Sequence, residues 1–513
     1  MPMAPRLARL LLFGALGLSG CVRLGPDFQT PREPWIDQWN SPAIEQASLD
    51  RPQPDLRQWW QVFDDPALDA LIAEADAYNP SLEIAGLRVM EARAQLGIAL
   101  SGRYPQVQQV SADALYLDRN QSGGRNPQDS HSWQYGAGFD AAWELDFWGR
   151  FSRAIESADA AYFAAYANYE DVLVLLRAQV ADTYYSLRTF EARLRIARDN
   201  AERQRRSFEI TERRFRSGDS DELDFQQAKT QYLGTLATIP DLESQVLRTR
   251  NALAVLVGRP PGPLPELRER EGLIPLLDRA VLQDVPANLL LRRPDVRAAE
   301  LAVAAQSALI GVSEADLYPS ITLLGSIGWS ASTLDGASDS LDLVAGPSLV
   351  WNVFDHGRIK NDVRVQDARL QQLIEAYRDG VRQAAREADD AATGLIKSLE
   401  SEHIRREAAE SAERSLTLAL AQYREGFADF QRVLDAQREL FQQQDSYLVS
   451  RSNAVANLIG LYKALGGGWQ RSGPLIDDGT RQQMQQRTDW GDLLDEPDAP
   501  SDTQLPIEQG ERP

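Results

Sequence analysis

The chain has 513 residues, a net charge of −21 and a pI of about 4.7, and without a basic region it is not expected to bind nucleic acid. Beyond the N-terminus no apolar run approaches the roughly 20 residues of a membrane-spanning helix, so we expect any membrane crossing to use strands. A single cysteine excludes an intramolecular disulfide, and the sequence contains no recognisable metal, cofactor or nucleophile motif, so we predict a protein that is not an enzyme and has no cofactor.

The first 20 residues have the features of a secretory signal. Arg6 and Arg9 precede a short apolar run that is too short for a stable span. The run ends in Leu18-Ser19-Gly20-Cys21, which resembles the bacterial lipoprotein processing box. That resemblance implies cleavage before Cys21, a diacylglycerol on its sulfur and an acyl chain on its new amine, which together anchor a protein firmly. It also implies the outer membrane, because Val22 replaces the aspartate that favours retention in the inner membrane.

The rest of the chain divides by composition and periodicity. Residues 21–58 are rich in Pro and Trp, which predicts an extended, lipid-anchored tether. Residues 59–260 and 285–470 are two copies of one helix-rich unit, joined by a linker at 261–284. The acidic tail, 471–513, is predicted to be disordered.

The duplication rests on matched motifs at a constant offset. The offset is 214 residues up to the strands and 208 after them, so one deletion between the strands explains the change. The matched motifs are Asn79-Pro80 with Arg293-Pro294, Tyr104-Pro105 with Tyr318-Pro319, Trp143 and Gly149-Arg150 with Trp351 and Gly357-Arg358, Phe215-Arg216-Ser217-Gly218 with Tyr423-Arg424-Glu425-Gly426, and Leu256-Val257-Gly258 with Ala464-Leu465-Gly466.

Each copy is predicted to contain a first helix, two strands, a very long helix and a return helix. In copy one the first helix runs from Pro66 to about Arg103, and the long helix from Gly149 to Arg216 would be roughly 100 Å long. Apolar residues spaced by four and three along it, from Phe151 to Leu176, indicate a coiled-coil seam. The first and return helices together nearly match the long helix, so we expect them to stack end to end beside it.

The strands alternate apolar and polar residues, as a bilayer-spanning barrel strand requires. From Ser132 to Trp148 every second residue is apolar, and copy two repeats the pattern on either side of about residue 335. Pro347 lies in the fourth strand and indicates an edge or a bulge. The loops near 118–130 and 331–340 are expected to be exposed turns. The aromatic residues expected to face the membrane are Trp133, Tyr135, Trp143, Trp329 and Trp351.

Four strands cannot close a barrel alone, and an open edge in lipid leaves backbone groups unpaired at several kcal/mol each. The chain must therefore assemble with itself. Two copies would give a filled eight-stranded barrel and three a twelve-stranded barrel with a lumen, and the polar face favours the larger number.

The chain resembles the TolC-family outer-membrane efflux lipoproteins over about residues 21–470. The fold class predicted is mainly α with a transmembrane β-barrel. The resemblance implies a homotrimer with a twelve-stranded barrel in the outer membrane and a periplasmic helical tunnel. A periplasmic adaptor protein and an inner-membrane pump are the implied partners. The motifs that carry the resemblance are the lipoprotein box, Gly25-Pro26-Asp27-Phe28, Trp59-Trp60 with Phe63 and Pro66, Val285-Pro286 with the run from Arg292 to Glu300, Phe354-Asp355-His356-Gly357-Arg358 and Leu434-Asp435-Ala436-Gln437-Arg438.

The family also implies a gate at the periplasmic tip of the tunnel. Asp435 matches a constricting aspartate ring, whose like charges would attract cations and respond to ionic strength. A second family aspartate, one turn earlier, is Arg432 in this chain. Tyr423 and Asp224 match a hydrogen-bonded pair that links the hairpins when the gate is closed, and Arg438 is expected to orient the carboxylate of Asp435.

Two other functions remain open from the sequence alone. The exit duct of a type I protein-secretion system has the same architecture. A coiled-coil scaffold lipoprotein without a pore would explain the helices, but not four alternating strands placed at the same point of each repeat. The exported substrate and the partner pump are not encoded in this chain.

Overall fold

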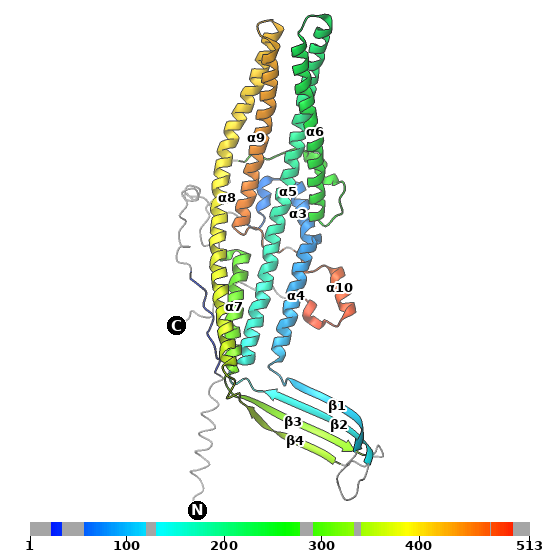
Figure 1. The fold of residues 1–513 in the computed structure, drawn as a ribbon, viewed down its shortest axis with the longest axis vertical. Coiled ribbons are helices and arrows are strands. Elements are labelled where there is room, and N and C mark those ends of the chain that lie inside the picture. Colours follow the sequence, from blue (N-terminus) through cyan, green and yellow to red (C-terminus); the bar gives the residue numbers. More distant parts are fainter. Residues whose placement is uncertain are drawn as a thin grey trace, which may run out of the picture.

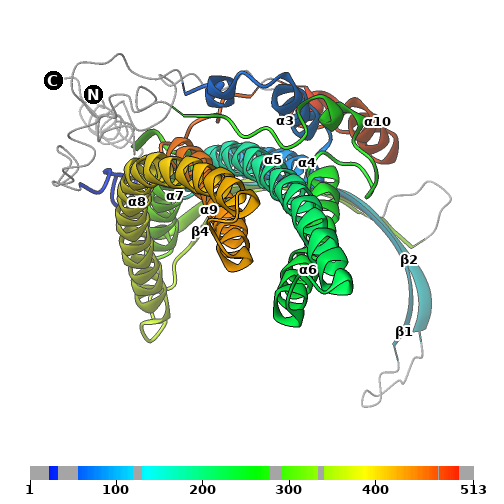
Figure 2. The same cartoon turned by 90° about the horizontal axis from the view of Figure 1, so that it is seen from above.

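The computed structural model describes residues 22–32, 56–119, 130–277, 291–332, 340–471 and 473–495. It is a long assembly of helices with a four-stranded sheet at one end (Figure 1). Cys21, the tips of both loops between strands and the Val285-Pro286 motif lie outside the described residues. Seen along its long axis, the helical part is a curved layer with an open concave side (Figure 2).

Two helical hairpins form the upper half of the molecule. The first joins α5 (Arg150–Ser217), 68 residues long, to α6 (Glu222–Leu256). The second joins α8 (Arg358–Arg424) to α9 (Phe430–Ala464). Gly218 and Gly426 adopt positive φ, 81° and 77°, at the ends of the long helices, a conformation that favours glycine and ends a helix. The predicted lengths of the long helices and the positions of both turns are confirmed.

Shorter helices flank the lower halves of the long ones. α4 (Pro80–Ser101) lies along α5, and α7 (Pro294–Ala315) packs between α5 and α8 (Figure 1). The prediction of one continuous helix from Pro66 to Arg103 was wrong, because α3 (Pro66–Tyr78) ends before Asn79. The Asn79 side chain accepts hydrogen bonds from the backbone N–H groups of Ser81 and Leu82 and caps α4, so α3 turns aside to cover the outside of the bundle.

The junction at Asn79 shows the internal repeat in atomic detail. Asn79 Nδ2 donates to the carbonyl of Leu256, at the last residue of α6, at 2.8 Å. Arg293, the matching residue of the second repeat, donates from Nη1 to the carbonyl of Ala464, the last residue of α9, also at 2.8 Å. In both repeats the residue before the helix-opening proline thus donates a hydrogen bond to a carbonyl at the end of the return helix, where the helix itself offers no donor.

The strands form one antiparallel sheet in the order β1-β2-β3-β4, namely Val107–Arg119, Ser130–Glu144, Ser320–Ala331 and Ser340–Val350. Its register places the predicted apolar residues of β2, β3 and β4 on one face, together with Val110 of β1, since Phe139 pairs with Val110 and Ile327, and Ile327 pairs with Leu343. Pro347 lies in β4, an edge strand of the sheet, as predicted.

Two strand ends differ from the sequence prediction. β2 ends at Glu144 and not at Trp148, because Asp146 turns the chain and caps α5 by accepting from the backbone N–H groups of Phe151 and Ser152. Likewise β4 ends at Val350, so Trp351 lies just beyond it, where its Nε1 donates to the carbonyl of Leu317 at 3.0 Å.

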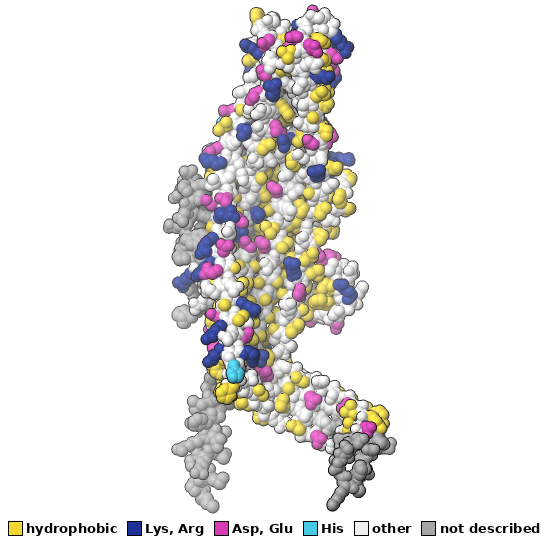
Figure 3. Space-filling view, viewed as in Figure 1, with side chains coloured by type: hydrophobic (Ala, Val, Ile, Leu, Met, Phe, Trp, Pro, Cys, Tyr) yellow, Lys and Arg dark blue, Asp and Glu magenta, His cyan; other side chains and the backbone are white. Residues whose placement is uncertain are grey.

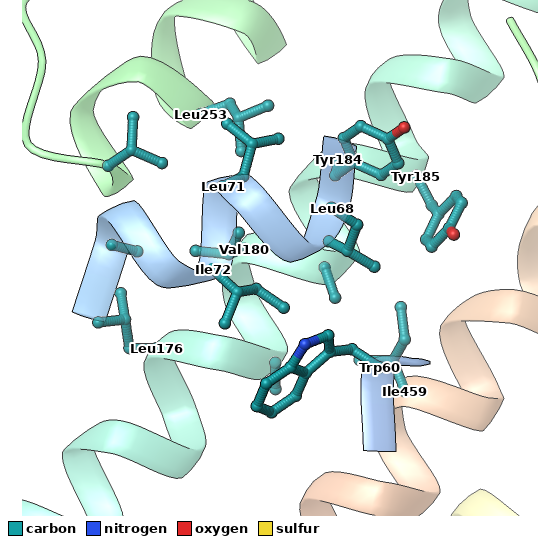
Figure 4. Close-up of a cluster of buried hydrophobic side chains, with 14 of the residues drawn as sticks. Trp60, Leu68, Leu71, Ile72, Leu176, Val180, Tyr184, Tyr185, Leu253 and Ile459 are labelled. Carbon is teal, nitrogen blue, oxygen red and sulfur yellow. The ribbon is translucent and has the colours of Figure 1, made fainter. Parts of the chain in front are cut away.

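The main hydrophobic core lies at the waist, where α3 and the short 3-10 helix η2 (Trp59–Phe63) cover α5 and the ends of α6 and α9. Figure 4 shows Leu68, Leu71 and Ile72 of α3 pointing into side chains from α5, with Trp60 and Ile459 beside them. These side chains are almost fully buried, so burial of apolar area by segments far apart in the sequence holds the waist together.

The N-terminal segment is seated on the helices. Arg153, buried on α5, donates to the carbonyls of Leu24 and Gly25 and to the carboxylate of Asp27. Gly25 lies so close to Gly311 of α7 that a Cβ on Gly25 would sit 2.5 Å from the Gly311 Cα. The prediction of an extended tether is therefore corrected for residues 22–32: the segment is extended, but it is fastened to α5 and α7.

The prediction of a disordered tail was wrong for residues 473–495. This segment contains α10 (Asp478–Arg487) and the 3-10 helix η6 (Gly491–Leu494), and it packs on α4. Arg93 of α4 donates to the carbonyl of Leu493 at 2.7 Å. The buried residues of segment 473–495 are Leu475, Ile476, Met484 and Leu494. These few apolar residues have no clear period, so the order of the segment comes from the surface that receives it.

One described helix, α7, is long and apolar enough to cross a bilayer by composition. More than half of its most apolar window is buried within the fold, where it packs against α5 and α8. It is a core helix of the bundle.

Candidate functional site

The predicted gate residues gather at the end of the molecule away from the sheet. The loops after Ser217 and after Arg424 form the tips of the two hairpins, which lie next to one another (Figure 1). Asp435 lies in the second turn of α9, on a face that is exposed in the single chain. Val433, Leu434 and Gln437 on the opposite side are buried against the rest of the bundle.

The Asp435 carboxylate is held by its own helix. Arg438 Nη1 and Gln431 Nε2 both donate to Asp435 Oδ1 at 3.1 Å. The contact expected between Arg438 and Asp435 is therefore present, although both side chains remain more than half exposed. Arg432, which replaces the second family aspartate, lies 4.0 Å from the carboxylate of Asp429. Asp429 and Asp435 are therefore each close to an arginine.

Tyr423 does link the two hairpins, but its partner is not the predicted one. Arg214, in the last turn of α5, donates from Nη1 to the Tyr423 hydroxyl, and its guanidinium lies 5.8 Å from the centre of the Tyr423 ring. Asp224 instead accepts from the Ser220 hydroxyl at 3.2 Å within its own hairpin. Among the described residues no hydrogen bond joins Tyr423 to Asp224.

Arg214 was missed from the sequence for a physical reason. A basic residue in the last turn of a helix is ordinarily explained by the negative end of the helix dipole. Only the packing of the second hairpin against α5, mainly through α9, shows that the guanidinium reaches across to a residue 209 positions away. The same Arg214 also donates to the carbonyl of Asp219 at 3.2 Å, which fixes the tip of its own hairpin.

The sheet at the other end has one apolar and one polar face. The predicted aromatic residues Trp133, Tyr135, Trp143 and Trp329 share the apolar face in the observed register. The opposite face carries Asp113, Asp140 and Asp342 with serines, glycines and a few apolar residues, and acidic side chains are visible on the sheet in Figure 3. On this face Gly136 lies against the Asp113 carboxylate, where a Cβ would sit 2.6 Å from an oxygen.

Aromatic side chains mark both ends of the sheet. Near the loops, the rings of Tyr116 and Trp133 pack edge to face across β1 and β2, 5.5 Å apart. At the helical end, Trp148 stacks on Tyr318 at 4.7 Å. Trp133 and Trp143 are separated by about 33 Å along β2 at the usual rise per residue. With the usual barrel tilt this corresponds to the roughly 25 Å apolar band between the aromatic girdles of an outer-membrane barrel.

Comparison with known families decides the class. The family model described as outer membrane efflux protein matches residues 71–259 and again 285–467. The chain belongs to the outer membrane efflux protein family. Each of the two matched ranges falls on one repeat, so the predicted two-fold repeat and the predicted family are confirmed. The ordered segment 473–495 lies outside both ranges.

Relatives of this efflux protein match it nearly end to end. The pyoverdine export outer membrane protein OpmQ of Pseudomonas putida is 32% identical over 85% of this chain and 92% of its own length. The cation efflux system protein CusC of Escherichia coli is 30% identical over 88% of this chain and 98% of its own length. The solvent efflux pump outer membrane protein SrpC of Pseudomonas putida is 32% identical over 90% of this chain and 98% of its own length.

Solved structures have the same fold. The outer-membrane channel OprN superposes with a TM-score of 0.79 and 33% identity over 87% of this chain and 99% of OprN. The transmembrane channel CusC superposes with a TM-score of 0.75 and 28% identity over 87% of this chain and 100% of CusC. This efflux protein is therefore an outer-membrane channel protein, mainly α-helical with a strand region, and it extends from the outer membrane into the periplasm.

Proposed function

We propose that three copies of this efflux protein form one duct, with a twelve-stranded barrel in the outer membrane and a tunnel of long helices below it. The observation that carries the proposal is the sheet. One face is mostly apolar, and the outer edges of β1 and β4 have no strand partner among the described residues. In lipid those edges must pair, and three copies close a barrel that leaves a lumen for the polar face.

Planar-bilayer recording combined with mass measurement tests the proposal. We expect the purified protein to run as a heat-modifiable trimer in detergent and to insert as discrete conducting channels. Light scattering that gives the mass of a single chain, or insertion without conductance, would contradict it. A trimer without conductance would favour the scaffold alternative, whereas passage of an unfolded polypeptide through the duct would favour type I protein secretion.

A periplasmic adaptor and an inner-membrane pump complete the proposed export route for drugs or other small molecules. The supporting observation is the chemistry of the hairpin tips. Phe427 and Leu223 expose most of their apolar surface there, and apolar side chains exposed at the tip of a hairpin are a candidate contact for another protein. The channel itself then performs no chemistry, and the pump selects the substrate. OpmQ, CusC and SrpC are named for pyoverdine, cations and solvents respectively.

The tips are also the proposed gate. Asp435, with Arg438 as its orienting partner and Arg432 one turn away, would line the narrowest part of the tunnel near the common axis. Tyr423, held by Arg214, would keep the hairpins together while the duct is closed, and Asp224, near the start of α6, would contribute by bonding to Ser220 at the tip of the first hairpin. The exposed position of Asp435 on α9 and the link from α5 to α8 support this assignment.

A covalent lipid on Cys21 is the proposed anchor. Residues 22–32 run along α5 and α7 at the level of the sheet junction, where the Leu24 N–H donates to the carbonyl of Trp148 at 3.2 Å. The segment that follows the proposed acylation site thus lies at the sheet junction, next to Trp148, which stacks on Tyr318.

Cys21→Ser should abolish acylation, because the thioether requires the cysteine sulfur. We expect metabolic labelling with radioactive palmitate to disappear in the variant, while Val22→Ala, one residue away, keeps the label. Labelling that persists in Cys21→Ser would contradict the anchor.

A further inference from the structure

The two terminal segments of the chain lie at equivalent places on the two repeats. Residues 473–495 lie on α4 of the first repeat, and residues 22–32 lie on α7 of the second. The offset of 214 residues that relates the repeats makes α4 and α7 counterparts. The segments run in opposite directions, with 473–495 running towards the sheet and 22–32 running away from it.

One pair of matched positions on the two short helices donates to the backbone of these segments. Arg93 of α4 donates to the carbonyl of Leu493 at 2.7 Å. Ser307, its counterpart on α7, donates to the carbonyl of Pro26 at 3.4 Å. Because both contacts are made to main-chain carbonyls, the two helices hold their segments in the same way, although the segments differ in sequence.

A second pair of matched positions lies two turns earlier on each helix. Gly86 of α4 lies directly against the carbonyl of Leu475, where a Cβ would overlap the oxygen. Glu300, its counterpart on α7, accepts from the Thr30 hydroxyl at 2.7 Å. The glycine at position 86 is therefore what allows the backbone of residues 473–495 to rest on α4.

Within a single chain α4 has less support than α7. α7 packs on both α5 and α8, whereas α4 packs extensively on α5 alone among the long helices that the structure describes. Ile84 and Ile98 of α4 expose 51% and 73% of their surface. One flank of α4 is thus open, and residues 473–495 supply the additional support.

The end of α4 is bonded to the edge of the sheet. α4 ends at Ser101 and β1 begins at Val107. Between them Gln106 donates to the carbonyl of Gly102 at 3.0 Å and accepts from the Glu144 N–H at 2.7 Å. The direction of α4 therefore sets the direction of β1, whose outer edge has no strand partner among the described residues.

We propose that residues 473–495 are a strap that holds α4 on α5 in the single chain and so presents the open edge of β1 to the next copy. A strand that is already held in the right direction loses less conformational freedom when it pairs, which speeds assembly. In the closed barrel the next copy supports β1, so the strap acts before assembly. The inference rests on the proposed trimer and adds the segment that prepares each copy for it.

Gly86→Ala tests the strap, and Gly97→Ala on the same helix is the matched control. A Cβ at Gly97 meets no atom within 4 Å, and alanine suits a helix better than glycine. We expect Gly86→Ala to form trimer roughly tenfold more slowly than Gly97→Ala or the unmodified protein on refolding into detergent, because its β1 edge is no longer preorganised. Trimers once formed should dissociate at similar temperatures. Equal rates of assembly, or lower heat stability without slower assembly, would overturn the strap.

A change in the strap itself excludes a defect of α4 as the cause. Ile476 is buried in the strap and Gln482 is exposed on it, so Ile476→Asp should detach the strap, because a buried charge is costly, while Gln482→Asp keeps it in place. We expect Ile476→Asp to assemble as slowly as Gly86→Ala and Gln482→Asp to assemble normally. If Ile476→Asp assembles as fast as Gln482→Asp, the proposal is wrong.

A separate measurement distinguishes failure of the strap from failure of the proposed duct. If the unmodified protein forms no trimer, the duct fails, and the strap is judged by hydrogen exchange of the single chain. The amides of α4 must then exchange faster in Gly86→Ala than in Gly97→Ala, since local opening follows the loss of contacts. Equal exchange of α4 in the two variants rejects the strap.

Discussion

Asp435→Ala is expected to raise the single-channel conductance severalfold. In the proposed trimer three Asp435 carboxylates, each with its Arg438, would surround the axis at the tip. Alanine removes the carboxylate and the side-chain bulk, and it releases Arg438 and Gln431, which both bond to that carboxylate. Charge and size at a constriction set what passes through it. Recording in a planar bilayer measures the effect directly.

The effect of the Asp435 charge on conductance can be separated from the effect of side-chain size by varying the salt concentration and by a matched variant. The cation preference of the unmodified channel should weaken as salt rises, because the Debye length falls from about 10 Å at 0.1 M to about 3 Å at 1 M. Asp390→Ala on α8 is the control, since Asp390 is also an exposed carboxylate paired with an arginine one turn away. Equal conductance of Asp435→Ala and Asp390→Ala would remove Asp435 from the gate.

Arg188→Ala is expected to lose most of the assembled protein. Arg188 on α5 is fully buried, and it donates to Glu191 at 2.9 Å, to the carbonyl of Leu267 at 2.8 Å and to the Tyr184 hydroxyl at 3.2 Å. Glu191 in turn accepts from the Gly272 N–H, so this cluster fastens the segment after the first repeat to the waist. Breaking a buried pair on one side costs about 3–5 kcal/mol, because the remaining charge stays buried.

The electrostatics of the cluster around Arg188 explain why Arg188→Ala is expected to lower the stability of the fold. Burial opposes the charged form of Arg188, but the hydroxyl oxygen of Tyr184 and the carboxylate of Glu191 hold its pKa above the ordinary value. Burial, and then the hydrogen bond to Asp65, raise the pKa of Tyr184. The guanidinium is therefore the positive centre on which the buried acceptors depend, and no neutral side chain of its size can satisfy all of them.

The yield of heat-modifiable trimer and the midpoint of thermal unfolding measure this loss. Arg205→Ala is the control on the same helix, because Arg205 forms ion pairs with Glu202 and Glu209 at the surface, where such pairs contribute about 0.2–1 kcal/mol. The double variant Arg188→Met with Glu191→Gln should recover part of the yield, since it leaves no unpaired charge. A midpoint for Arg188→Ala equal to that of Arg205→Ala would contradict the assignment.

Much of the fold follows from short-range patterns. Prolines at the starts of α4 and α7, glycines at the ends of the long helices and the two periodicities of apolar residues each act over a few residues. The repeat then doubled every local signal, which made the helix lengths and the strand faces predictable. The site was partly predictable for the same reason: Arg438 and Asp435 lie one turn apart on one helix, so their contact depends only on helix geometry.

The errors share a different cause. The break at Asn79 occurs because its side chain has a partner at Leu256, and the ordered segment 473–495 has few apolar residues but a receiving surface on α4. Tyr423 bonds to Arg214 and not to Asp224, because the packing of the second hairpin against α5 brings Arg214 within reach. A pattern of neighbouring residues cannot predict a hydrogen-bond partner that lies hundreds of residues away in the sequence.

By itself the sequence determined a duplicated chain of very long helices and four amphipathic strands, because helix and strand periodicity and their Pro and Gly boundaries are properties of neighbouring residues. Only the tertiary structure decided which polar residue meets which across the hairpins, such as Asn200 with Gln444 and Ser207 with Gln437. The reason is that hydrogen-bond partnership and burial depend on how separate helices are placed against one another.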